Sequence, residues 1–203
     1  MPINAQGYLQ HIRQYLNNID YGKTSLAKER RRIRQNELVL SEKLETGNRR
    51  KVKLTFQGEA FAIRLDCSKV PLFHFLFNGQ GMLWDKRCDF IVFHCYQDNL
   101  NVYCIEFKEA STRINNDQIM LQLEASKAWV KSLKGIVDAY ANKNCTISIS
   151  QYVFTACRNP LPDLEPSGRY LRKYPSIRHY LFTEVDGMAL EDLENECADT
   201  LGL

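Results

Sequence analysis

The sequence contains no long apolar run. Its longest uninterrupted stretches of apolar residues span only a few positions, as in Phe90-Ile91-Val92-Phe93, whereas a helix that crosses a bilayer needs about 20. The first residues also lack the charged and then apolar order that is typical of a signal peptide. These absences predict a protein without a transmembrane helix that resides in the cytoplasm.

Several short motifs are absent as well. No two cysteines have C-x-x-C spacing, there is no G-x-S-x-G nucleophile elbow, and Gly22-Lys23-Thr24 lacks the glycine-rich lead-in of a P-loop. The seven cysteines are an odd number, and several lie in apolar runs, which predicts reduced thiols packed in the core. With 44% apolar and 25% charged residues, the 203-residue chain has the composition of a folded domain.

Charge is present but segregated along the chain. Residues 23–53 contain eleven Lys and Arg against four Glu, whereas residues 184–203 contain seven Asp and Glu and no Lys or Arg. A basic segment of this kind can neutralise phosphates, although a solvated helix face has the same composition. For the acidic tail we expect a final helix over residues 188–200, with Leu190 and Leu193 on its inner side.

The apolar spacing predicts an α/β or α+β domain. A period near 3.6 favours helices, and alternation favours strands. The order of elements predicts a central mixed β-sheet flanked by helices, with basic N-terminal helices over residues 1–47, the core over 48–160 and a C-terminal extension over 161–203. The expected helices cover residues 5–20, 25–46 and 116–134, and the expected strands cover residues 52–56, 61–65, 89–96, 101–108, 146–157 and 180–182.

Three charged residues mark the ends of the two most apolar strands. Asp89 opens the first strand, and Glu106 and Lys108 close the second. Depending on the centre of the turn, residue 89 lies opposite residue 108 or residue 106, and either register puts the three side chains on one face. A loop of odd length would send Asp89 to the other face, and a bulge could restore it. Two close carboxylates repel each other unless a cation joins them. The cluster therefore predicts a Mg²⁺ or Mn²⁺ site, with the Phe107 carbonyl as a further ligand.

This pattern resembles a known family. Asp89, sixteen intervening residues and Glu106-Phe107-Lys108, within RCDFIVF and VYCIEFKEAS, are similar to the PD-(D/E)XK nuclease superfamily with its restriction-endonuclease-like fold. The resemblance covers roughly residues 25–157, and Cys88 stands where the family often has proline. It implies that Asp89 and Glu106 bind the metal and that Lys108 assists the attacking water. Gln122, on the next helix, is expected to contact the lysine, the water or the phosphate, or to be an ordinary hydrogen-bonded amide.

The family often uses a further acid on its first core helix. In the predicted helix 25–46, Ile33, Glu37, Leu40 and Leu44 form one stripe, which makes Glu37 the expected metal ligand. Glu59 is the reserve candidate, and Glu42 and Glu45 lie off the stripe. Nucleic-acid contacts are expected from the basic helix and from a second segment in which basic residues alternate with tyrosines, namely from Arg30, Arg31, Arg34, Arg172 and Lys173.

The sequence thus favours a metal-dependent endonuclease that acts on DNA rather than RNA. Little chain remains for a separate sequence-reading domain, so we expect nonspecific cutting, or targeting by a partner protein or a second copy of the chain. A role as effector in a bacterial defence system is consistent with the resemblance. The alternative is a non-catalytic nucleic-acid-binding or assembly subunit that has kept the fold.

Overall fold

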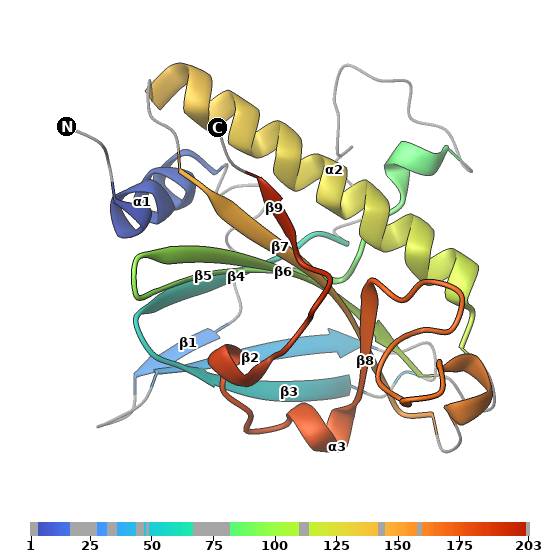
Figure 1. Cartoon of the computed structure of the whole chain (residues 1–203). Helices are drawn as coiled ribbons and strands as arrows, with labels where there is room; N and C mark the ends of the chain where they lie inside the picture. Colours follow the sequence, from blue (N-terminus) through green and yellow to red (C-terminus); the bar gives the residue numbers. More distant parts are fainter. Residues whose placement is uncertain are drawn as a thin grey trace.

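A six-stranded mixed sheet forms the centre of the computed structural model (Figure 1). The model describes residues 4–16, 28–31, 36–43, 47, 49–66, 82–109, 114–141, 145–157 and 160–201. The sheet order is β4 (Glu59–Arg64), β5 (Phe90–Tyr96), β6 (Asn99–Lys108), β7 (Ile147–Thr155) and β8 (Ile177–Leu181), with β9 (Asp199–Leu201) also paired to β7. Strands β4, β5 and β6 are antiparallel, and β6, β7 and β8 are parallel. The predicted α+β class with a mixed sheet is confirmed.

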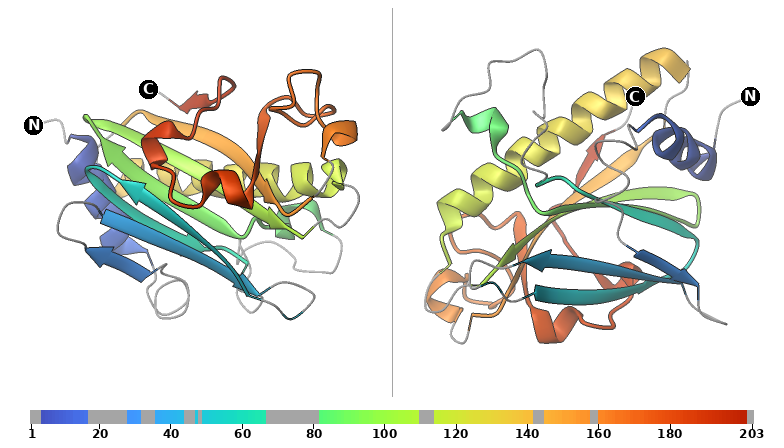
Figure 2. Two further views of the ribbon diagram at one scale, coloured as in Figure 1. Left: turned by 90° about the horizontal axis from the view of Figure 1, so that it is seen from below. Right: turned by 180° about the vertical axis from the view of Figure 1, so that it is seen from behind.

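Two different layers cover the faces of this sheet (Figure 2). Helices α1 (Ala5–Tyr15) and α2 (Asn116–Ala141) pack on one face, and α2 is the crossover between β6 and β7. On the other face lie α3 (Phe182–Val185) and a separate antiparallel sheet of β1 (Lys28–Arg31), β2 (Asn36–Lys43) and β3 (Arg49–Phe56). Alternate residues of β6 enter the two cores, because successive side chains of a strand point to opposite faces.

The β5–β6 hairpin has a two-residue turn. Tyr96 pairs with Asn99, and the turn residues Gln97 and Asp98 have φ angles of 49° and 60°. Positive φ at both positions is the mark of a type I′ turn, whose twist matches that of the strands it joins. The turn therefore selects one of the two registers expected from the sequence, the one that sets position 89 opposite position 106.

The predicted helix over residues 25–46 is wrong. The described part of this segment forms the hairpin strands β1 and β2. Leu38, Leu40 and Glu42 are spaced by two residues, and all three are buried on the inward face of β2. A short apolar run fits both a helical and a strand period, and pairing of all eight β2 residues with β3 decides the outcome here.

The expected helix over residues 188–200 is also wrong. This segment forms a 3-10 turn at Leu190–Asp192 and then β9, although Leu190 and Leu193 are buried as expected. Helix α2 is longer than predicted and continues through Gly135. Residues 17–20 and 71–81 lie outside the described part of the chain. Among the described helices, none combines the length and the apolar character needed to cross a membrane.

Candidate metal centre

Asp89, Glu106 and Lys108 come together where β5 begins and β6 ends. The main-chain N–H of Asp89 donates to Oε2 of Glu106 at 3.2 Å. In return, the N–H of Phe107 donates to Oδ2 of Asp89 at 2.6 Å. The Lys108 ammonium lies 2.6 Å from Oε1 of Glu106. The hairpin thus fixes two acids and one amine in a single contact network.

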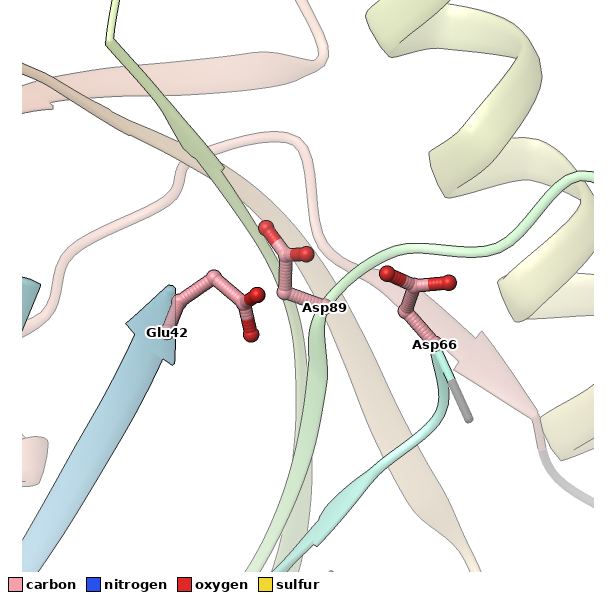
Figure 3. A group of neighbouring side chains, drawn as sticks. All are labelled: Glu42, Asp66 and Asp89. Atoms are coloured by element: carbon pink, nitrogen blue, oxygen red, sulfur yellow. The ribbon is translucent and has the colours of Figure 1, made fainter. Parts of the chain in front are cut away.

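Two further carboxylates reach Asp89 from other strands (Figure 3). Glu42 comes from the end of β2, and Asp66 lies two residues after the end of β4. One carboxylate oxygen from each of Glu42, Asp66 and Asp89 lies within 4.8 Å of the others. The N–H of Leu65 donates to the Asp89 carbonyl at 3.0 Å, which holds Asp66 beside Asp89. The cluster therefore draws its acids from both sheets.

Burial makes the cluster electrostatically unfavourable without a cation. Burial, together with the negative charge of Glu106, raises the pKa of Asp89 well above its usual range. Burial raises the pKa of Glu106 to about 7, although Lys108 opposes this shift. Burial also raises the pKa of Glu42, against the influence of Arg64, which lies 2.6 Å away. The nearby cations therefore do not compensate for the removal of these carboxylates from water.

The donor set fits a hard divalent cation. The three converging carboxylates offer oxygen atoms, which are the ligands that Mg²⁺ and Mn²⁺ prefer. Asp66 is exposed whereas Glu42 and Asp89 are buried, so the cluster has a side that water and ions can reach. Oε2 of Glu42 is buried and has no hydrogen-bond partner among the described residues. A cation would satisfy this oxygen and would reduce the repulsion between the acids.

Helix α2 holds the segment that leads into Asp89. The Ser126 hydroxyl accepts the N–H of Cys88 at 2.8 Å, and Nε2 of Gln122 donates to the Arg87 carbonyl at 3.0 Å. The Oε1 atom of Gln122 is buried, and no described residue bonds to it. Gln122 therefore contacts the chain beside the cluster in this structure, and its contact is to a backbone carbonyl rather than to Lys108.

The two upstream acids proposed from the sequence do not join the cluster. Glu37 lies five positions before Glu42, so it faces the other side of β2 and is separated by about 17 Å along the strand. Glu59 lies at the opposite end of β4, where its carboxylate accepts hydrogen bonds from Gln6 and Gln10. Phe107 contacts Asp89 through its N–H, and no described contact involves its carbonyl at this site.

The basic residues expected to bind nucleic acid have varied surroundings. Arg30 and Arg31 lie in strand β1 rather than on a helix, and Arg34 is outside the described residues. The exposed Arg172 donates from Nε to the Leu164 carbonyl at 3.0 Å. Lys173 pairs with Asp117 at 2.5 Å. The last two cations are thus engaged in contacts within the molecule.

Glu42 and Asp66 are the site residues that sequence reasoning missed. Glu42 continues the two-residue spacing of Leu38 and Leu40, which was a signal for a strand end. Asp66 follows the alternating segment 61–65, but nothing local indicates its nearness to Asp89. No protein-family model, curated protein or solved structure matches the chain. The argument for function therefore depends on the geometry of the cluster and on its residue pattern.

Proposed function

We propose that the protein is a divalent-metal-dependent hydrolase of phosphodiester bonds in nucleic acid, with DNA the favoured substrate. The observation that carries this proposal is the convergence of Glu42, Asp66 and Asp89 beside the Glu106–Lys108 pair. Glu42, Asp89 and Glu106 are buried acids with raised pKa values, which is destabilising by itself, and such groups cluster at functional sites. A purely structural role gives no reason to assemble them.

The residues of the cluster have separable roles in this proposal. Glu42, Asp66 and Asp89 would hold the cation, which when bound neutralises charge on a phosphate oxygen and acidifies a water molecule. The Lys108 side chain is about a quarter exposed, and its contact with Glu106 fixes its direction. Its ammonium can orient a water or stabilise negative charge that develops on phosphate. Gln122 and Ser126 position the backbone before Asp89.

The order of elements supports a nuclease of the PD-(D/E)XK type. Asp89 directly precedes β5, Glu106-Phe107-Lys108 ends β6, and α2 then crosses to the parallel strand β7. This is the order that the sequence resemblance implies for a restriction-endonuclease-like core. Arg49, Lys51 and Lys53 are exposed along β3, and a group of exposed cations favours a polyanionic substrate over a small phosphate ester.

A cleavage assay tests this proposal. Supercoiled plasmid and single-stranded DNA are incubated with the parent protein in Mg²⁺, in Mn²⁺ and in EDTA, and cleavage is expected only with metal. Asp89→Ala and Lys108→Ala should each lower the rate at least ~100-fold. Lys131→Ala, on the exposed side of α2, is the control and should cut at the parent rate.

The opposite outcomes are equally specific. Cleavage by Asp89→Ala and Lys108→Ala at the parent rate would contradict the assignment of the site. Tight binding without cleavage in any of these metal conditions would instead favour a non-catalytic nucleic-acid-binding subunit.

A further inference from the structure

The outward face of β3 carries a regular row of cations. Arg49, Lys51 and Lys53 alternate along the strand and are exposed, whereas Val52 and Leu54 between and after them are buried. Across the sheet, Arg49 pairs in register with Lys43 of β2, which is also exposed. Directly opposite residues of an antiparallel pair share a face. Four positive charges, the cation row, therefore lie on one face: Lys43, Arg49, Lys51 and Lys53.

The charge of this row is only partly offset by nearby acids, as in the Coulombic attraction between Arg49 and Glu42. Among the described residues, none of the ion pairs involves a member of the cation row. The β2 residues opposite Lys51 and Lys53 are the uncharged Ser41 and Val39. Asp186 contacts the edge of β3, where its carboxylate accepts the main-chain N–H of Lys53 at 2.9 Å. The face is therefore strongly positive in a protein whose formal net charge is only +3.

The cation row begins beside the candidate metal centre. Lys43 directly follows Glu42, whose side chain turns inward to Asp66 and Asp89. From Arg49 to Lys53 the row then extends about 13 Å away from that point along the strand. Because neighbouring residues of β2 point to opposite faces, one strand end presents an acid to the cluster and a cation to the outer surface.

We propose that the cation row on the outward face of β2 and β3 binds the sugar-phosphate backbone of a nucleic acid and leads it to the Asp89 cluster. This inference rests on the proposed hydrolase function and names the surface by which the substrate is held. Lys and Arg side chains gain affinity by displacing counterions from phosphates. Contacts of this kind set position without reading bases, so binding by the cation row is expected to be independent of sequence.

Equilibrium binding without metal tests the surface directly. The anisotropy of a fluorescent 20-base-pair DNA duplex, and of one of its single strands, is measured in EDTA with the intact protein. Lys51→Gln with Lys53→Gln is compared with Lys127→Gln with Lys131→Gln, which removes the same charge from α2 on the other side of the central sheet. Circular dichroism and thermal unfolding show whether each protein is folded.

The row predicts a difference between these two double variants. At about 100 mM salt, loss of Lys51 and Lys53 should weaken binding roughly tenfold or more and lower the salt slope by about two. The α2 variant should stay within about twofold of the parent. Equal affinity of the Lys51 and Lys53 variant and the parent would overturn the inference, and so would an equal loss in both variants.

Cleavage measured in parallel separates this inference from the proposed function. If the parent cuts and the Lys51 and Lys53 variant cuts with the same KM, the surface is wrong and the hydrolase stands. If the parent binds through the row but never cuts, the surface stands and the hydrolase is wrong. If the parent neither binds nor cuts either DNA, both are overturned.

Discussion

Asp89 and Glu106 face each other across the β5–β6 hairpin, and the N–H of Asp89 is bonded to the Glu106 carboxylate. In the part of the chain that the structure describes, a single ammonium, that of Lys108, is within ion-pair distance of Glu106. Two buried acids thus share one close cation, and a third acid, Glu42, adds to the charge that raises the pKa of Asp89. The arrangement is poor for stability and suited to binding a cation, so it gives predictions of opposite sign for the two properties.

Asp89→Asn should stabilise the metal-free protein while abolishing cleavage. The change removes a buried charge, and the amide oxygen can still accept the Phe107 N–H. Burial and the charge of Glu106 make the Asp89 carboxylate unfavourable in the fold, so a gain of roughly 1 kcal/mol, the ordinary size of a single-substitution effect, is expected in EDTA. Urea unfolding followed by circular dichroism measures it. Asp192→Asn, at an exposed position, is the control, and a loss of stability in Asp89→Asn alone would contradict the electrostatic argument.

Glu42→Gln should weaken binding of Mn²⁺ about tenfold or more, because one of the three converging carboxylates loses its charge. Isothermal titration calorimetry of the folded protein measures the change. Glu37→Gln is a matched control, since Glu37 is a buried acid on the same strand that faces away from the cluster. Weakening by Glu37→Gln alone would replace Glu42 by Glu37 as the metal ligand, and equal weakening by both substitutions would show that the effect is not specific to the cluster.

Ser126→Ala should destabilise the fold, because the buried N–H of Cys88 loses its hydrogen-bond acceptor. Leaving a buried donor without a partner costs about 1–3 kcal/mol. Ser132→Ala on the same helix is the comparison, since the Ser132 hydroxyl is exposed and bonds only to its own helix. Chemical denaturation should show a clear loss for the first variant and almost none for the second. Similar values for both would show that α2 does not anchor the chain before Asp89.

His179 should make the fold sensitive to acid. Its ring lies 2.8 Å from the Thr155 hydroxyl, and burial lowers its pKa to about 4, with Glu184 and Arg178 acting in opposite directions. In the unfolded chain the pKa of His179 is near 6.5, so between pH 6.5 and pH 4 the unfolded state binds a proton that the folded state does not bind. The contribution of this group is full above pH 6.5 and is lost as the pH falls to about 4, by roughly 3 kcal/mol.

His179→Gln provides the measurement for this effect. The free energy of unfolding of the variant should fall less steeply between pH 6.5 and pH 4 than that of the parent. Parallel pH profiles for the two proteins would show that His179 is protonated without penalty in the folded state.

The sequence was sufficient to predict secondary structure where the apolar pattern and the turn-forming residues indicated the same element. An apolar strand, turn-forming residues at 97–99 and a second strand predicted the β5–β6 hairpin, whereas the length of the turn, and with it the register of Asp89 against Glu106 or Lys108, was open. It was insufficient where a short segment satisfied two periods, so that Leu40 fitted both a helical stripe and a strand face. The nearness of Glu42, Asp66 and Asp89 depends on how two sheets stack, and no spacing along the chain encodes that relation directly.

The supply of Glu42 by the small sheet and of Asp89 by the large one has a mechanical consequence. An ion bound by both acids would link the two sheets, and the cation row belongs to the smaller of them. If the linked arrangement of the sheets binds substrate better than an unlinked one, thermodynamic reciprocity requires metal and substrate to change each other's affinity by the same factor. Under the proposed function, a nucleic acid bound to the cation row would then raise the affinity of the Asp89 cluster for its metal ion.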